Sequence, residues 1–427
     1  MDAMQAPLLE RMPLAGSGGM LNDIWETPGV MQNLLQKHLN GGKVNFPSLN
    51  KPLERPHKLA GRTPFEILAN CSLVDGSVTN RIQIIGCGTS WHAALLGEYL
   101  FEHIARIPVD VQYASEFRYR QPLVRPNDVV IVVSNSGETL DAVESLRTVR
   151  SCENGESILT VAFVNEADCT IGRESDAVVE AMAGTEVGVA STKVFSSTVL
   201  AFALLAVALG THNGCFSETE CRELLQKMEE LPGHVQQVLD RESRPLRQDA
   251  PRAGTLEPAL AIGECILWDI GCQNVLASNF IFLGRGFNFP IALEGAMKCK
   301  EIAYIHAEGY PAAEMKHGPI ALIDQFMPVV CITPRSDPTY EKIKANIEEV
   351  KARNGATIAI TEDFNTELED ICEHVIHVPC THEYLMPLIS VIPLQLLAYM
   401  MGALRGNEVD NPRGLQKSIT EIGDTGP

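Results

Sequence analysis

The chain has 427 residues and a mass of 46.6 kDa, with 45% hydrophobic and 21% charged residues. This length predicts two or three domains, and the composition excludes a small disulfide-stapled module, a disordered chain and a fibrous rod. Lys and Arg number 34 against 54 Asp and Glu, which gives a formal net charge of -20 and excludes general binding to the phosphate backbone of nucleic acids.

The cysteines and the apolar stretches indicate the compartment. The 12 cysteines are scattered without a CxxC pair, so neither a zinc site nor a disulfide framework is predicted and a reducing, cytoplasmic location is expected. Residues 1–20 lack the cationic and apolar regions of a signal peptide. The uncharged stretches 194–210 and 385–404 are interpreted as core helices and not as membrane spans, because the first is short and the second contains two prolines and Gln395.

The first half of the chain has the pattern of parallel βαβ units. Residues 22–39 predict an amphipathic helical arm, and residues 51–63 a Pro-rich connector. Short β-branched runs then alternate with helical stretches. Strands are predicted at 81–85, 109–113, 128–134, 158–164 and 178–181. A long apolar helix is expected after Ser191.

The second half repeats this pattern. Residues 217–239 predict a helix and residues 240–257, rich in Arg, Pro and Asp, a surface insertion. Further strands are predicted at 280–283, 328–333, 357–361 and 374–378. A Gly-x-Gly sequence stands at a strand end in each half, and Val129 follows Gly86 by 43 residues while Val329 follows Gly284 by 45.

We therefore predict a duplicated α/β fold in which each copy is a parallel sheet flanked by helices. The expected parts are an N-terminal arm and connector (1–63), a first domain (64–216), a helical linker with an insertion (217–278), a second domain (279–405) and a C-terminal tail (406–427).

Two hydroxyl-rich loops follow successive strands of the first half. Residues 86–90 (GCGTS) and 134–139 (SNSGET) each precede a predicted helix, where backbone amides and hydroxyls favour an anion. Taken singly, the first loop also fits a packing turn or a dinucleotide site, and the second fits an ordinary N-cap. Two such loops at one edge of a parallel sheet favour a single shared ligand there.

Longer motifs resemble a known family. GCGTSWHAA, ASEFRYR, SNSGET and AGTEVGVASTK in the first half resemble the sugar isomerase (SIS) phosphosugar-binding domain. With residues 283–324 and DNPRGLQKS at 410–418, the sequence from residue 22 to 418 resembles the isomerase part of the glutamine:fructose-6-phosphate amidotransferases, the glucosamine 6-phosphate synthases. The glutaminase domain of that family, which begins with a catalytic cysteine, is not expected because Asp2 follows Met1.

A charged cluster is predicted in the second half. Glu294, Lys298 and Glu301 are spaced to share one helix face. An exposed Glu-Lys-Glu ladder is the alternative, but the neighbouring residues Ala292, Leu293, Ala296, Met297 and Ile302 are apolar. The resemblance implies that Glu301 moves a proton between C1 and C2 of the opened sugar, with Lys298 nearby.

The resemblance also implies roles for residues that would otherwise be read as a turn histidine and a surface lysine. His317 resembles the histidine that opens the sugar ring, which in this family is contributed to the site by the neighbouring subunit. Lys417 resembles the lysine that forms an imine with the keto sugar under a mobile C-terminal lid. The residues implied to bind the phosphate are Thr89, Ser90, Ser134, Asn135, Ser136 and Thr139, with Val189 and Ser191 near the sugar.

Two departures from the family pattern affect these residues. Asn135 stands where the family has Gln, and Gln416 replaces a small residue beside Lys417. The shorter amide of Asn135 has less reach, and the altered tail affects the fit of the lid over the sugar.

The resemblance implies conversion of fructose 6-phosphate to glucosamine 6-phosphate by a homodimer, as in the supply of UDP-N-acetylglucosamine, with ammonia from solution or from a separate glutaminase. The alternatives are deamination of glucosamine 6-phosphate and a non-catalytic sugar-phosphate sensor, and the sequence does not separate them. No metal is expected, since no cluster has metal-ligand spacing. No nucleotide cofactor is expected either, since an acid/base pair and a lysine imine suffice for this chemistry.

Overall fold

The computed structural model describes residues 19–54, 59–71, 73–74, 77–78, 80–243 and 265–417, so most of the predicted insertion at 240–257 lies outside the described residues. The chain forms two compact units. Unit 1 takes the residues up to Pro28, Glu186–Thr192 and Glu230–Leu415. Unit 2 takes Gly29–Thr185, Lys193–Glu229 and the residues from Gln416 onward.

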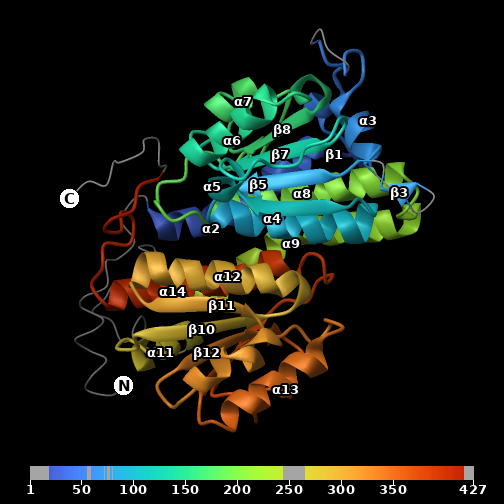
Figure 1. Ribbon diagram of the computed structural model, residues 1–427. Coiled ribbons are helices and arrows are strands. Elements are labelled where there is room, and N and C mark those ends of the chain that lie inside the picture. Colours follow the sequence, from blue (N-terminus) through green and yellow to red (C-terminus); the bar gives the residue numbers. More distant parts are fainter. Residues whose placement is uncertain are drawn as a thin grey trace. The chain divides into compact units, whose positions relative to one another are not determined.

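Unit 2 is built on a parallel five-stranded sheet in the order β6-β5-β7-β8-β9 (Figure 1). The strands are β5 (Ile82–Gly86), β6 (Val109–Tyr113), β7 (Val129–Ser134), β8 (Leu159–Val164) and β9 (Ala177–Glu180). All residues of β5, β7 and β8 are buried, as the continuous apolar runs predict for strands covered on both faces. The five predicted strands are confirmed with shifts of about one residue at their ends.

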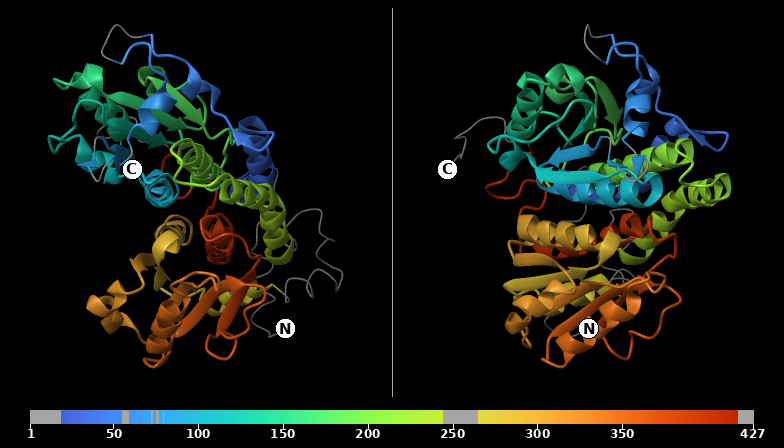
Figure 2. Two further views of the ribbon diagram at one scale, coloured as in Figure 1. Left: turned by 90° about the vertical axis from the view of Figure 1, so that its right-hand side faces the viewer. Right: turned by 45° about the vertical axis from the view of Figure 1, so that its right-hand side comes forward.

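Helices cover both faces of this sheet (Figure 2). Helices α4 (Thr89–Leu100) and α8 (Lys193–His212) pack together on one face, and α5 (Ala114–Phe117), α6 (Leu140–Ser151) and α7 (Thr170–Glu174) lie on the other. Unit 2 also includes all or part of α2 (Met20–His38), α3 (Pro64–Ala69), α9 (Glu218–Glu242) and two hairpins, β1–β2 (Leu39–Asn40, Lys43–Val44) and β3–β4 (Leu73–Val74, Ser77–Val78). The helices predicted at 22–39 and 217–239 correspond to α2 and α9.

Unit 1 repeats the same topology, with the sheet order β11-β10-β12-β13-β14. The strands are β10 (Asn279–Gly284), β11 (His306–Pro311), β12 (Pro328–Ile332), β13 (Ala356–Glu362) and β14 (His374–Val378). Helix α12 (Phe289–Lys298) packs against α14 (Met386–Leu404), which also contacts α11 (Ile266–Gln273), while α13 (Tyr340–Lys351) covers strands β12 and β13. The predicted α/β duplication is confirmed.

Strand β11 was not predicted from the sequence. It pairs in parallel with β10, from Asn279 with His306 to Gly284 with Pro311. Its glycine and proline disfavour a strand by propensity, but Pro311 is tolerated because β11 is an edge strand. Gly309 is required by packing, since an added Cβ atom would lie 2.7 Å from the carbonyl oxygen of Ala292 in α12.

Helices α4 and α12 end in the same irregularity. A π-helical turn follows each, at Phe101–Ala105 and Cys299–Ala303. Each turn ends in a left-handed residue, Arg106 with φ 55° and Tyr304 with φ 53°. Such turns insert one residue into a helix and are common at functional sites. The duplication therefore extends to the helix ends.

The two apolar helices identified in the sequence are core elements of the described structure. Helices α8 and α14 are long and apolar enough to cross a membrane, but 89% and 100% of their most apolar segments are buried inside the structure. Core helices of α/β proteins have this composition.

Candidate active site

The two hydroxyl-rich loops lie at one edge of the unit 2 sheet. Strands β5 and β7 are parallel neighbours, with Gly86 beside Val133, so the loops that follow them emerge side by side. Thr89 and Ser90 form the first turn of α4, and residues 134–139 lead into α6. The structure thus brings together the six residues that the sequence assigned to a phosphate, at the carboxyl edge where such sheets bind ligands.

The 134–139 loop is held by its own hydroxyl groups. Ser134 Oγ accepts a hydrogen bond from the amide of Gly137 at 3.1 Å and lies 3.3 Å from Thr139 Oγ1. Ser136 Oγ accepts from the amide of Glu138 at 3.2 Å. Gly137 has φ +66°, and a Cβ atom there would lie 2.1 Å from Cys169 Sγ. Only glycine fits this turn, which sets the hydroxyls at the N-terminus of α6 before any ligand arrives.

The charged cluster of unit 1 is buried. Lys298 Nζ lies 3.3 Å from Glu294 Oε1 and 2.5 Å from Glu301 Oε2. The side chains of Glu294 and Lys298 are 0% exposed, whereas that of Glu301 is 23% exposed. The exposed-ladder alternative is therefore wrong. Burial alone lowers the pKa of Lys298, but the carboxylates of Glu294 and Glu301 outweigh it and raise the pKa above its ordinary value.

The helix that carries the cluster differs from the expected one. Glu294 and Lys298 lie in α12, but Glu301 lies in the π-helical turn that follows. The three residues were predicted to share the face of one continuous α-helix. The wider turn places Glu301 at the end of α12, where its carboxylate contacts the ammonium group of Lys298 and is also partly open to solvent.

Comparison of the two repeats shows that the fold does not require these charges. Counted from the Gly-x-Gly turns, Glu294 and Lys298 correspond to Leu96 and Leu100 of α4, which are both buried. Burying an ion pair in place of two leucines is seldom favourable for stability. The cluster is thus better explained by chemistry than by packing.

The predicted sugar contacts Val189 and Ser191 belong to unit 1 and are half-buried. Their loop is closed by the buried carboxylate of Glu186, which accepts a hydrogen bond from the amide of Thr192 at 2.7 Å. Within the loop, the amide of Gly188 donates to Oδ2 of Asp23, which lies outside the loop, at 2.7 Å. The loop is therefore fixed to the start of α2.

His317 and Lys417 are both exposed. His317 ends the short 3-10 helix Glu314–His317 in unit 1 and makes no ion pair with the Lys298 cluster among the described residues. Lys417 belongs to unit 2 and is the last described residue. The tail before it is held in unit 1, where the amide of Arg413 donates to the hydroxyl of Tyr304 at 2.8 Å. Sequence reasoning missed Tyr304, whose only signal was its position three residues after Glu301.

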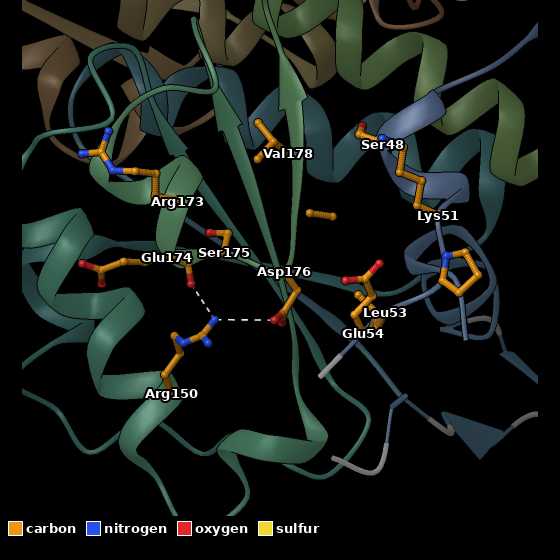
Figure 3. Close-up of a pocket in the computed structure, with 12 residues that line it drawn as sticks. Ser48, Lys51, Leu53, Glu54, Arg150, Arg173, Glu174, Ser175, Asp176 and Val178 are labelled. Carbon is orange, nitrogen blue, oxygen red and sulfur yellow. Dashed lines mark hydrogen bonds and ion pairs between the residues drawn. The ribbon is translucent and has the colours of Figure 1, made fainter. Parts of the chain in front are cut away.

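A separate cavity lies at the opposite edge of the unit 2 sheet. It has a volume of about 490 Å³ and is lined by Lys51, Glu54, Arg150, Arg173 and Asp176, among others (Figure 3). Asp176 directly precedes β9, so the cavity faces the amino ends of the strands. Arg150 is engaged there by Asp176 at 3.5 Å and by the carbonyl oxygen of Glu174 at 2.5 Å. This cavity is therefore separate from the two hydroxyl-rich loops, which lie at the carboxyl edge of the sheet.

No group of three or more His, Cys, Asp or Glu side chains within the described ranges is arranged to hold a metal ion. The 12 cysteines are all free thiols.

The fold and the two loops define the class of protein. The family model of the SIS domain matches residues 77–208 and 276–405, and the chain belongs to the SIS domain family. The prediction of two SIS domains is confirmed.

The curated relatives are longer than this chain. The glutamine-fructose-6-phosphate aminotransferase (isomerizing) of Chlorobaculum tepidum is 44% identical over 403 residues, which cover 94% of this chain and 58% of the relative. That of Bacteroides thetaiotaomicron is 39% identical over 401 residues, with the same coverage. The chain thus spans 58% of the length of these relatives, and its predicted similarity to part of them is confirmed.

Solved structures agree in fold. The C-terminal domain of glucosamine-fructose-6-phosphate aminotransferase from Francisella tularensis has a TM-score of 0.76 at 29% identity, covering 92% of this chain and 98% of that one. Glucosamine-6-phosphate deaminase from Thermotoga maritima has a TM-score of 0.66 at 19% identity, over 94% and 99% of the two chains, which is a likeness of fold alone.

Proposed function

We propose that this chain converts fructose 6-phosphate and ammonia to glucosamine 6-phosphate and water, as a phosphosugar isomerase and aminotransferase. The observation that carries the proposal is the buried Lys298 between Glu294 and the partly open carboxylate of Glu301. The aminotransferase names of the relatives support the choice of substrate.

The loops of the first repeat would bind the phosphate. The hydroxyls of Thr89, Ser90, Ser134, Ser136 and Thr139 supply neutral donors, and the first turns of α4 and α6 supply amides that favour a dianion. Asn135 is expected to donate its amide from the same loop, and Val189 and Ser191 to contact the sugar. The two loops bind the phosphate through neutral hydroxyls and amides and need no cationic side chain. This agrees with a chain whose net charge is -20.

The reaction divides into steps that need different groups. His317, supplied by the neighbouring subunit of a homodimer, opens the ring. The amine of Lys417 adds to the C2 carbonyl and forms an imine with loss of water, and ammonia then displaces Lys417 from C2. Glu301 takes a proton from C1 and returns one to C2, while the proton of the C1 hydroxyl passes to the nitrogen on C2. This leaves an aldehyde at C1 and the amine at C2. Lys298 holds the Glu301 carboxylate in position through the 2.5 Å contact.

The remaining elements of the proposal concern the surroundings of the enzyme. The ammonia comes from solution or from a glutaminase partner, and the chain works in the cytoplasm. The acidic pI of about 5.0 and the 12 free thiols support such a location.

The test is NMR of the purified chain with fructose 6-phosphate and 15N-labelled ammonium, and separately with glutamine. Glu301→Gln should reduce formation of glucosamine 6-phosphate by at least about 100-fold, the usual scale for loss of a general base, while the sugar still binds. Glu348→Gln, at an exposed position of α13, is the matched control and should leave the rate unchanged.

Three results would count against the proposal. Equal turnover of every hexose phosphate by Glu301→Gln and the unaltered chain would remove the proton-transfer role. Binding of the sugar without any product from ammonium would favour a sensor, and release of ammonia from glucosamine 6-phosphate without the forward reaction would favour a deaminase.

A further inference from the structure

The second repeat contains a counterpart of the hydroxyl-rich loop. Strands β7 and β12 occupy the same place in their sheets, and each leads through a loop into a helix, α6 or α13. Strand pairing aligns the two repeats here. Ile85, just before Gly86 in β5, lies beside Val132, and Leu283, just before Gly284 in β10, lies beside Cys331. Residues 333–339 (TPRSDPT) thus correspond to residues 134–139, and Thr333 corresponds to Ser134.

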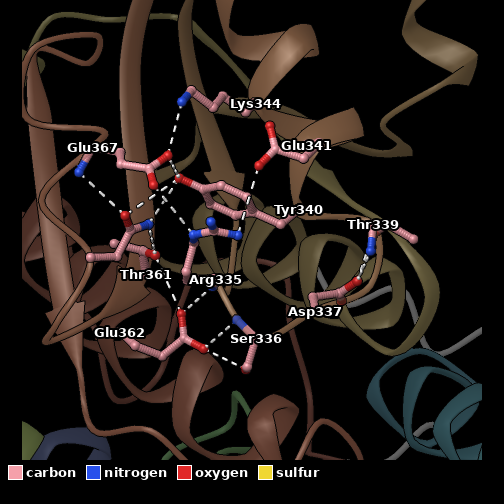
Figure 4. A network of polar contacts seen from close by, with 11 residues as sticks. Arg335, Ser336, Asp337, Thr339, Tyr340, Glu341, Lys344, Thr361, Glu362 and Glu367 are labelled. Atoms are coloured by element: carbon pink, nitrogen blue, oxygen red, sulfur yellow. Dashed lines mark hydrogen bonds and ion pairs between the residues drawn. The ribbon is translucent and has the colours of Figure 1, made fainter.

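A buried carboxylate already occupies the loop of the second repeat. Glu362, at the end of β13, is 0% exposed. It accepts hydrogen bonds from the amide of Arg335, from the amide of Ser336 at 3.0 Å and from Ser336 Oγ at 2.5 Å (Figure 4). Two backbone amides and a hydroxyl converging on one group form an anion site at the N-terminal side of α13. The anion in this site is supplied by the chain itself.

The first repeat has an amide at the position that corresponds to this carboxylate. Ser134 pairs with Val164, and Ile332 pairs with Ile360, so Asn165 is the counterpart of Glu362. The side chain of Asn165 turns away, donating to the carbonyl oxygen of Gly184 at 2.7 Å and accepting from the amide of Ala183 at 2.9 Å. The position that Glu362 fills in the second repeat is therefore left to a ligand in the first.

A second feature of the loop also indicates an anion. The Thr333 side chain is fully buried, and its Oγ1 has no hydrogen-bond partner among the described residues. Its counterpart Ser134 is one of the proposed phosphate contacts. The loop also carries Arg335, whose guanidinium lies 3.5 Å from Glu367 and 3.7 Å from Glu341 (Figure 4). An unpaired buried hydroxyl, loop amides and an arginine together suit a phosphate dianion.

We propose that the second repeat holds a latent phosphate site that is closed by the carboxylate of Glu362. Phosphate binds the unaltered chain at the first repeat only, and removal of this carboxylate creates a second site for a phosphate dianion. The inference goes beyond the proposed reaction. It rests on the proposed function for phosphate binding at the first repeat, whereas the closed site of the second repeat rests on the pairing of the two loops and on the contacts of Glu362.

The test compares the full chain with Glu362→Ala, using inorganic phosphate as the probe and chloride at equal ionic strength as the reference. Thermal denaturation should show that phosphate raises the Tm of the variant by more than it raises the Tm of the unaltered chain. Equilibrium dialysis with labelled phosphate should find one more bound phosphate per chain in the variant. The second substitution Thr333→Val, placed on Glu362→Ala, should weaken this added phosphate by about tenfold, the scale of one hydrogen bond to a charged group.

Asn165→Ala, at the corresponding position of the first repeat, is the matched control and should add no phosphate. Glu362→Asn, which copies the counterpart Asn165 and is shorter than Glu362, replaces Glu362→Ala if alanine prevents folding. The proposal is overturned if neither variant binds more phosphate than the unaltered chain, or if the unaltered chain already binds two. An unaltered chain that binds none, beside a variant that binds one, would instead contradict the proposed phosphate contacts of the first repeat.

Discussion

Arg413 in the C-terminal tail is held by Tyr304. Its backbone amide donates to the Tyr304 hydroxyl at 2.8 Å, and its guanidinium carbon lies 4.3 Å from the centre of the same ring. Tyr304 is the left-handed residue that ends the π-helical turn carrying Glu301. The tail that leads to Lys417 is thus tied to the chain three residues from the proposed base.

Tyr304→Phe should loosen this attachment. The substitution keeps the ring under the guanidinium but removes the acceptor of the Arg413 amide, at a cost of about 1 kcal/mol. Hydrogen exchange followed by mass spectrometry should show about fivefold faster exchange at Arg413. Tyr119→Phe, at a side chain that is 72% exposed, should leave exchange in the tail unchanged. Equal exchange in both variants would show that the hydroxyl does not hold the tail.

Lys298→Met should be strongly destabilising. The methionine has nearly the same length, but the buried carboxylate of Glu294 loses its counter-charge, which typically costs about 3–5 kcal/mol. Urea denaturation measures the loss. Lys300→Met, two residues along at an exposed position, should change the free energy of unfolding by less than about 0.5 kcal/mol.

The double variant Glu294→Leu/Lys298→Leu copies the residues of the first repeat. We expect it to recover most of the stability lost in Lys298→Met, because an apolar pair often replaces a buried ion pair without cost. It should nevertheless fail to form glucosamine 6-phosphate. A stable double variant with full activity would show that the charged pair is structural.

Gly137→Ala should damage the phosphate loop by two effects. At φ +66° an alanine is strained by about 1–2 kcal/mol, and its Cβ atom would lie 2.1 Å from Cys169 Sγ. Gly184→Ala separates the effects, since Gly184 has the same φ but no atom within 4 Å of an added Cβ. Gly137→Ala should therefore lower the Tm more than Gly184→Ala, and Cys169→Ala should restore part of the difference. Equal losses at the two glycines would exclude the steric effect.

Glu98 in α4 should make stability depend on pH. Burial, with contributions from Glu102 and Asp110, raises the pKa of Glu98 from 4.5 to about 7. The folded state therefore keeps a proton that the unfolded state loses, so this residue costs stability as the pH rises from about 4.5 to 7. Glu98→Gln removes that cost. In thermal denaturation, the Tm of the variant should rise relative to the Tm of the unaltered chain between pH 4.5 and pH 8. A Tm difference that stays constant over this range would contradict the expectation.

Much of the fold could be predicted because local patterns agree with it. The apolar runs of β5 and β7 indicate buried parallel strands, and the spacing after Gly86 and Gly284 indicates a duplication. Strand β11 could not be recognised from its own residues, since Gly309 and Pro311 reflect packing against α12 and an edge position. Its one available signal was the repeat, because β6 stands at the corresponding place.

The candidate site could be predicted where side chains act through neighbours in sequence. The residues of the 134–139 loop are close in the chain, and the structure brings them together with Thr89 and Ser90. The role of Glu362 could not be predicted, because the sequence shows only a polar residue at a strand end. Its contacts with Ser336 depend on the pairing of β12 with β13, which joins segments far apart in the chain.

The assembly of unit 1 limits how this protein can be dissected. Its described part includes the start of α2, the loop Glu186–Thr192 and the long stretch from Glu230, and hydrogen bonds join them, from Gly188 to Asp23 and from the amide of Met20 to Asp410 at 2.7 Å. The amide of Val189 also donates to the carbonyl oxygen of Asp410 at 3.0 Å. A fragment cut between the two repeats would leave Val189 on one piece and Asp410 on the other. Experiments on isolated halves would thus report on incomplete units, and fragments produced by a nick in the linker should co-purify.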